Sequence, residues 1–142
     1  MKTPKKTQKS QALIYQTKDG AIEFNLDKKK ETILANINQI AELFGVQKAA
    51  ISKHLSNIFD DEELNKSATV SILETVQIEG DRKVSRKIEA YNLDAIIAVG
   101  YRVNSKRATQ FRIWSTKILK QYLFVVYAVK KKLIEKNYES FN

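Results

Sequence analysis

The 142-residue sequence predicts an α+β fold, and three patterns lead to this class. Short apolar segments flank Asp19-Gly20 and again Gly80-Asp81, which predicts two β-hairpins, because such glycine-containing pairs form tight turns. Residues 37–59 have the apolar spacing of two short helices joined at Gly45. Towards the C-terminus, apolar side chains recur in steps of three and four, which predicts one long α-helix. Because the second hairpin follows the helix pair directly, the order of elements is that of a winged helix-turn-helix.

The N-terminal segment, residues 1–11, is polar and is expected to form a disordered basic arm. It contains the only proline of the chain and four lysines, Lys2, Lys5, Lys6 and Lys9. Such an arm either lies along nucleic-acid phosphates or only keeps the chain soluble, and the sequence leaves both interpretations open.

The first hairpin is expected to have its strands at residues 13–15 and 22–26. In the second of these, apolar and polar residues alternate, as they do in a strand that buries one face. A third short strand, at residues 32–34, is expected to lead into a helix that Asn36 or Asn38 caps.

The helix pair has the residue order of a helix-turn-helix. A small residue, Ala41, lets the second helix cross the first closely, and Gly45 permits the positive φ that the turn requires. Val46 then fills the angle between the helices, while Ile51 and Leu55, four residues apart, anchor the second helix to the core. The structural alternative is a plain helical hairpin inside a core.

The outer face of the second helix has the side chains of a DNA recognition helix. Short amide, hydroxyl and basic groups reach base edges and phosphates from a helix that lies in the major groove. The residues expected to contact DNA from this helix are Gln47, Lys48, Ala49, Ser52, Lys53 and Ser56.

The second hairpin is expected at residues 69–79 and 84–91, where β-branched residues are frequent. Its tip and return strand carry four cations, Arg82, Lys83, Arg86 and Lys87. Cations beside a recognition helix neutralise the neighbouring DNA backbone or enter the minor groove, so Arg82, Lys83 and Arg86 are candidate DNA contacts. The alternative is an edge strand whose charges protect it from aggregation.

Two further helices are expected after this hairpin. Asn92 caps a short helix that ends at Gly100, and Asn104 or Ser105 starts the long helix, which reaches Asn137. The long helix carries an apolar stripe, Phe111, Trp114, Ile118, Tyr122, Val125, Val129 and Leu133. Its second half is apolar on more than one face, which predicts a homodimer through this helix; the alternative is a helix packed on its own domain.

The expected organisation of the whole chain is an arm at 1–11, a winged helix-turn-helix DNA-binding domain at 12–104, and a dimerisation or partner-binding helix at 105–142.

The overall composition favours a polyanionic partner. The formal net charge is +9 and the pI is about 9.6, which suits nucleic acid first and an anionic membrane second. The absence of cysteine excludes disulfides and cysteine-based zinc sites. No secretory signal and no apolar segment of about 20 residues is present, so a cytoplasmic protein without a membrane partner is expected.

Enzymatic activity is not expected. The single histidine, His54, lies on the expected recognition helix, and the run Asp60–Glu63 is expected to be a solvated turn. No Gly-rich phosphate loop, nucleophile elbow or metal-ligand spacing is present. We therefore expect no cofactor, no metal ion and no small-molecule substrate.

Residues 91–123, YNLDAIIAVGYRVNSKRATQFRIWSTKILKQYL, resemble the signature of the RhuM family of virulence- and prophage-associated proteins. The upstream segment QIAELFGVQKAAISKHLSNIF resembles the N-terminal part of that family, so the resemblance runs from Leu13 to Ala128. Family members are usually longer, and this chain corresponds to their N-terminal half, either as a fragment or as a short member. It has Ile33-Leu34-Ala35 where Trp-Leu-Thr is common, and Ala90 where a histidine is often found. The resemblance implies DNA binding.

The signature gathers cations around the expected start of the long helix. Lys106 and Arg107 are expected to contact phosphate, because a helix N-terminus attracts anions. Arg102 and Arg112 are either part of the same phosphate clamp or tie Asp94, Glu89 or helix carbonyls together inside the fold.

The function that these patterns favour is sequence-specific binding of double-stranded DNA by a dimer, in transcriptional control of a prophage, a mobile element or a pathogenicity island. A protein-interaction adaptor, similar to a phage antirepressor and acting through the C-terminal helix, is the main alternative. An RNA-binding module is a third, but the exposed stacking aromatics that it needs are not evident.

Overall fold

The computed structural model describes residues 12–27 and 29–140; the predicted basic arm lies outside this range. The chain divides into two compact units, with the division between Ala108 and Thr109. Each unit is described by itself.

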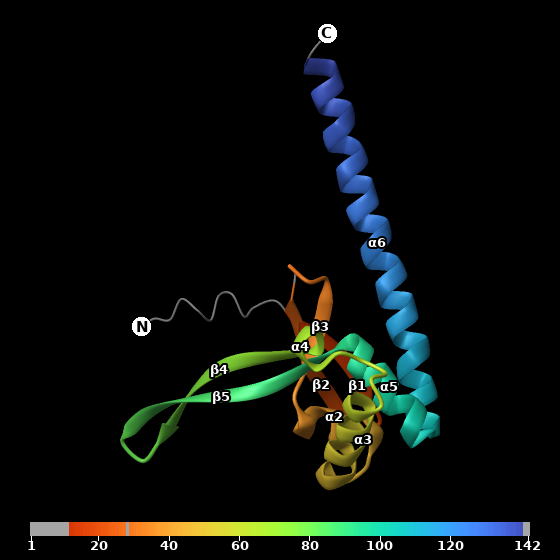
Figure 1. Ribbon diagram of the computed structural model, residues 1–142. Coiled ribbons are helices and arrows are strands. Elements are labelled where there is room, and N and C mark those ends of the chain that lie inside the picture. Colours follow the sequence, from red (N-terminus) through yellow and green to blue (C-terminus); the bar gives the residue numbers. More distant parts are fainter. Residues whose placement is uncertain (1–11, 28, 141–142) are drawn as a thin grey trace. The chain divides into compact units, whose positions relative to one another are not determined.

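A five-stranded antiparallel sheet forms the frame of the first unit (Figure 1). Its strands are β1 (Ala12–Thr17), β2 (Gly20–Asp27), β3 (Thr32–Ala35), β4 (Val70–Glu79) and β5 (Arg82–Asn92), in the spatial order β1-β2-β3-β5-β4. The predicted α+β class is confirmed. The strand β3, which precedes the helix pair, pairs with β5, which begins more than forty residues later in the sequence. In this pairing Leu34 lies opposite Asn92, and Ala35 lies opposite Tyr91.

Both predicted hairpins are present, each with a two-residue turn. In the first, Thr17 lies opposite Gly20, so the turn residues are Lys18 and Asp19, one position earlier than predicted. Gly20, at φ 144°, instead begins β2, and its carbonyl oxygen accepts a hydrogen bond from the Thr17 hydroxyl at 2.9 Å. In the second hairpin, Gly80 and Asp81 form the turn as predicted.

The predicted helix pair consists of α2 (Ile37–Phe44) and α3 (Lys48–Asp60). Asn36, not Asn38, caps α2, because its side chain accepts the Gln39 amide hydrogen at 2.8 Å while the Gln39 side chain accepts that of Asn36 at 2.9 Å. The Gln39 side-chain nitrogen also donates to the Glu23 carbonyl oxygen at 2.7 Å, which ties the start of α2 to β2.

A short helix, α4 (Lys66–Thr69), was not predicted from the polar segment after α3. Asn65 caps it by accepting the Ala68 amide hydrogen at 3.1 Å. One turn of helix leaves no apolar periodicity in the sequence, so only its cap was available as a signal.

The helix α5 (Leu93–Val103) begins at its predicted cap, Asn92, but the prediction that Gly100 ends it was wrong. The helix continues for three more residues, and Asn104, at φ 51°, terminates it by donating its amide hydrogen to the Gly100 carbonyl oxygen at 2.8 Å. Gly100 instead lies inside α5 at a closely packed position. A Cβ at this position would lie 3.2 Å from the Phe44 ring and 3.5 Å from the Ala108 methyl group.

The core of the first unit lies where α2, α3 and α5 meet the sheet. The largest fully buried side chains of the first unit are Phe24, Ile40, Leu43, Ile51, Ile58, Ile96 and Val99. The Leu93 amide hydrogen, at the start of α5, is donated to the Thr32 hydroxyl on β3 at 3.0 Å. On β5, burial and a hydrogen bond to Glu89 raise the pKa of Tyr91 to about 12.

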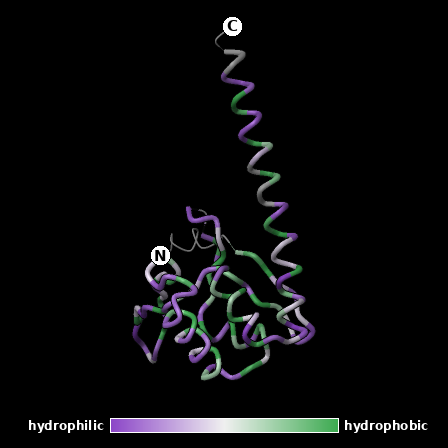
Figure 2. Tube along the Cα trace, turned by 45° about the vertical axis from the view of Figure 1, so that its right-hand side comes forward, coloured by the Kyte–Doolittle hydropathy of each residue, from purple (hydrophilic) through white to green (hydrophobic). Residues whose placement is uncertain are grey.

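The second unit consists of most of α6 (Lys106–Ser140), which Ser105 caps by accepting the Ala108 amide hydrogen at 3.2 Å. Apolar and polar residues alternate along it (Figure 2). Several of its large apolar side chains are exposed, among them Phe124 (70%), Tyr127 (64%) and Ile134 (68%). No helix within the described residues is both long enough and apolar enough to cross a membrane.

Candidate nucleic-acid interface

The helix α3 divides into a buried and an exposed face. Ile51, Leu55 and Ile58 are 0%, 3% and 0% exposed, and they fix the helix to the core. The six candidate contacts predicted on this helix are all exposed: Gln47, Lys48, Ala49, Ser52, Lys53 and Ser56. Gln47 occupies the N-cap position without using its side chain in a capping hydrogen bond. The helix therefore presents amide, hydroxyl and ammonium groups on one continuous surface.

The turn before α3 has the geometry that the sequence predicts. Gly45 has φ 69°, in the left-handed region, and donates its amide hydrogen to the Ala41 carbonyl oxygen at 2.8 Å. Val46 donates to the same oxygen at 3.1 Å and is partly buried. These two bonds close the end of α2 and set the direction in which α3 leaves.

Arg107 reinforces this turn from a distant part of the chain. Its guanidinium donates to a carboxylate oxygen of Asp19 at 2.5 Å and to the Glu42 carbonyl oxygen at 3.2 Å. It therefore connects the first turn of α6 to the tip of the first hairpin and to the end of α2. Lys106, its neighbour, is exposed. Both were expected to contact phosphate; Arg107 donates instead to two protein partners, Asp19 and Glu42.

Substituting Gly45 tests how tightly this turn is constrained. In Gly45→Ala, the new Cβ would lie 2.7 Å from an Arg107 guanidinium nitrogen and the residue would keep a positive φ. Gly80→Ala is the matched control, because Gly80 has a similar φ of 64° with nothing within 4 Å. We expect Gly80→Ala to lower the free energy of unfolding by about 1 kcal/mol through backbone strain alone. Gly45→Ala should cost up to about 1 kcal/mol more, because the Arg107 guanidinium must move and its exposed contacts weaken. Equal losses in urea denaturation would mean that Arg107 does not support the turn.

The hairpin of β4 and β5 extends away from the helices as a two-stranded ribbon (Figure 1). Arg82 and Lys83 are exposed near its tip, whereas Arg86 donates two hydrogen bonds to the Glu79 carboxylate, at 2.7 and 2.9 Å. The four cations of the hairpin are matched by four carboxylates, at Glu74, Glu79, Asp81 and Glu89. The hairpin is therefore neutral overall and not the basic element that its cations alone indicated.

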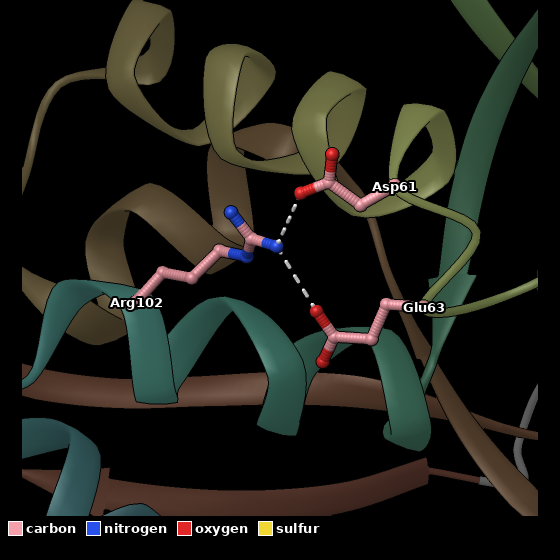
Figure 3. A network of polar contacts seen from close by, with 3 residues as sticks. All are labelled: Asp61, Glu63 and Arg102. Carbon is pink, nitrogen blue, oxygen red and sulfur yellow. Dashed lines mark hydrogen bonds and ion pairs between the residues drawn. The ribbon is translucent and has the colours of Figure 1, made fainter.

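Arg102 has a structural role, but the predicted partners were wrong. Its guanidinium lies between Asp61 and Glu63, at 3.2 and 3.1 Å from their carboxylate oxygens (Figure 3). The hydrogen bonds that Arg102 donates to Glu63 and Asp61 raise its pKa, because they favour the charged guanidinium. Of the partners expected from the sequence, Glu89 instead accepts a hydrogen bond from Tyr91 at 2.9 Å. Arg102 thus ties the end of α5 to the acidic segment after α3.

Arg112 lies on α6, in the second unit. Within this helix, one guanidinium nitrogen donates to the Thr109 hydroxyl at 3.4 Å. Among the described residues, no three His, Asp or Glu side chains gather as a metal site requires.

The net charge is distributed unevenly along the chain. Residues 12–108 contain fourteen Lys and Arg residues and fourteen Asp and Glu residues, so the part that folds around the sheet is neutral by sequence. Residues 1–11 contribute four cations and no anion, and residues 109–142 contribute seven cations and two anions. The whole net charge of +9 therefore lies outside residues 12–108. The per-segment charge count is a sequence signal that the composition alone conceals.

Comparison with known protein families identifies a family for the C-terminal half of the chain. The model of the Virulence protein RhuM family matches residues 68–142, which include the whole signature at 91–123 and extend to the end of the chain. The matched segment begins after α3, so neither the first hairpin nor the helix pair lies within it. No curated protein and no solved structure matches the chain.

Proposed function

The chain belongs to the RhuM family, and from that premise we propose that it binds double-stranded DNA sequence-specifically, with α3 as the recognition helix of a winged helix-turn-helix. The wing of this proposal is the hairpin of β4 and β5. We further propose that the protein acts in the cytoplasm on the transcription of a prophage, a mobile element or a pathogenicity island.

The exposed face of α3 is the observation that carries the proposal. Its six exposed residues have the side-chain chemistry of base and phosphate contacts, and its opposite face is anchored by three buried aliphatic residues. The topology supports the same interpretation, because β3 precedes the helix pair and β5 returns beside it. In a winged helix-turn-helix, this pairing sets the hairpin next to the recognition helix.

Charge along α3 gives the helix a preferred direction towards DNA. Its first half carries Lys48 and Lys53, whereas Asp60 and the acidic residues after it lie at the opposite end. Phosphate would be attracted to the first half, where the helix dipole is positive, and repelled from the second. The N-terminal half of α3 is therefore expected to make the base contacts.

Selection of bound sites from a random duplex library, at near-physiological salt, tests this function. We expect convergence on one motif that is bound at least about 10³-fold more tightly than a scrambled duplex. A purified chain that binds every duplex alike, or binds single-stranded RNA more tightly, would contradict sequence-specific recognition of double-stranded DNA.

We propose that the active form is a homodimer through α6. The exposed apolar side chains of this helix supply the contact surface, and an inverted repeat in the selected motif would be its signature. Because each copy of residues 109–142 has a net charge of +5, self-association should strengthen as salt screens the repulsion. Light scattering at tens of micromolar protein should give twice the chain mass of 16.3 kDa in moderate salt. A mass of one chain at every salt concentration would exclude this dimer.

The same exposed side chains, Phe124, Tyr127 and Ile134, favour a second candidate function. In this alternative, the protein is an adaptor similar to a phage antirepressor, and α6 binds another protein. The library experiment separates the two, because an adaptor would bind DNA only weakly and without preference.

A further inference from the structure

The neutral charge of residues 12–108 raises the question of which residues supply the attraction to DNA. We infer that Lys130, Lys131, Lys132 and Lys136 of α6 form a phosphate-binding segment for the nucleic-acid backbone. The inference rests on the proposed DNA binding and adds a second site to it, distinct from the α3 face. None of these four lysines is among the DNA contacts expected from sequence motifs.

The four lysines are exposed, and the described part of the chain gives none of them an ion-pair partner. Glu135 is the only carboxylate between Thr109 and Lys136. Residues 130–136 contain four lysines and one carboxylate, a net charge of +3, whereas residues 27–31 contain three lysines and two carboxylates, a net charge of +1. A cationic segment with this excess attracts a polyanion and releases its counterions on binding.

The geometry of α6 spreads this charge around the helix. Successive residues of an α-helix are about 100° apart, so Lys130, Lys131 and Lys132 point in three well-separated directions. Lys136, four residues after Lys132, extends one of these rows by a further turn. The segment thus forms a cationic collar, which presents an ammonium group on whichever side of α6 faces a phosphate backbone.

The cations of the first unit are placed differently. Arg86, Arg102 and Arg107 all form ion pairs with carboxylates of the same unit. The lysine run at residues 28–30 is directly flanked by Asp27 and Glu31. A phosphate backbone therefore gains less from these cations than from the collar on α6, because nearby carboxylates offset their potential.

The ligand that suits the collar is the phosphate backbone and not the base edges. Lysine is a point charge without the planar fork that arginine offers, and its contacts with phosphate groups carry no sequence information directly. The α3 face is then responsible for specificity, and the collar for affinity that is independent of sequence and sensitive to salt.

Two matched triple variants test this division. The chain contains two runs of three lysines, one in the collar and one in the neutral unit, and replacing either run by glutamine removes the same charge. The variants are Lys130→Gln with Lys131→Gln and Lys132→Gln, and Lys28→Gln with Lys29→Gln and Lys30→Gln. Glutamine keeps nearly the helix propensity of lysine, so α6 should remain folded, which circular dichroism verifies.

The measurement is the dissociation constant for a fixed duplex between about 50 and 200 mM salt. The slope of log K against log salt is negative, and its magnitude should decrease by about 0.9 for each phosphate-contacting lysine that is removed. We expect this magnitude to decrease by about 1 to 3 units in the collar variant and by less than about 0.5 in the control. The selected motif should be the same for both variants. Equal slopes for the two variants, or a larger effect of the control, would overturn the inference while leaving DNA binding intact. Failure of the proposed function itself would be distinguishable, because the unmodified chain would then lack sequence-specific binding.

Discussion

Replacing Gln47 and Lys53 together by alanine is expected to weaken binding to the selected duplex by at least about 30-fold. Each good contact with a base edge contributes about 1–3 kcal/mol of discrimination, so two such contacts give about 2–6 kcal/mol. Both side chains are exposed, on the half of α3 that carries its two lysines. The measurement is the dissociation constant of the double variant for the selected duplex and for a scrambled one.

The same variant should bind the scrambled duplex almost as the unmodified chain does, with a salt slope lower by at most about one unit. A suitable control is Lys29→Ala with Gln110→Ala, which removes the same two side-chain types from exposed positions outside α3. Unchanged affinity of Gln47→Ala with Lys53→Ala for the selected duplex would show that α3 does not recognise the motif.

The second large effect is on stability. Ile51→Ala should lower the free energy of unfolding by about 2–5 kcal/mol, because it removes a fully buried side chain and leaves a cavity. Its neighbour Ser52 is exposed, and Ser52→Ala should change stability by less than about 0.5 kcal/mol. Urea denaturation of the two variants measures the contrast between adjacent residues on opposite faces of α3.

This pair also tests the orientation of the helix. If Ser52→Ala were as destabilising as Ile51→Ala, the face assigned to DNA would be part of the core. The Ile51→Ala variant should in addition bind the selected duplex more weakly, because α3 loses one of the contacts that hold it in place.

Most of the local structure was predictable because short-range patterns determine it. The capping box of Asn36, the positive φ of Gly45 and the two-residue turn at Gly80 each depend on neighbouring residues. The buried and exposed faces of α3 follow from helical periodicity in the same way.

Two errors were local, the turn at Lys18 and Asp19 and the missed helix α4, and the others concern contacts between residues that are distant in sequence. Gly100 was expected to end α5, but it lies inside the helix, where a Cβ would be in tight contact, at 3.2 Å, with the Phe44 ring. Arg107 reaches Asp19 across 88 positions and Arg102 reaches Asp61 across 41, and no local pattern predicts either pair. Charged residues in particular have many possible partners, and only the fold selects among them.

The candidate site was predictable in part. The outward-facing residues of α3 follow from the position of the apolar ones, but the attraction of this unit for DNA was overestimated from the total charge. Counting Asp and Glu beside Lys and Arg in each segment shows that residues 12–108 are neutral and that the excess lies elsewhere. In the hairpin of β4 and β5, for example, four carboxylates balance the four cations that were interpreted as a basic wing.

The contact between α3 and DNA is the central claim, and a tethered cleavage reagent tests it directly. Because the chain has no cysteine, Ser52→Cys provides one site for coupling a reagent that generates hydroxyl radicals. Lys66→Cys, at another exposed position, serves as the control. With the selected duplex, we expect strand cleavage centred on the motif from position 52 and weak or displaced cleavage from position 66. Cleavage from position 66 but none from position 52, in a protein that still binds the duplex, would contradict the assignment of α3 as the recognition helix.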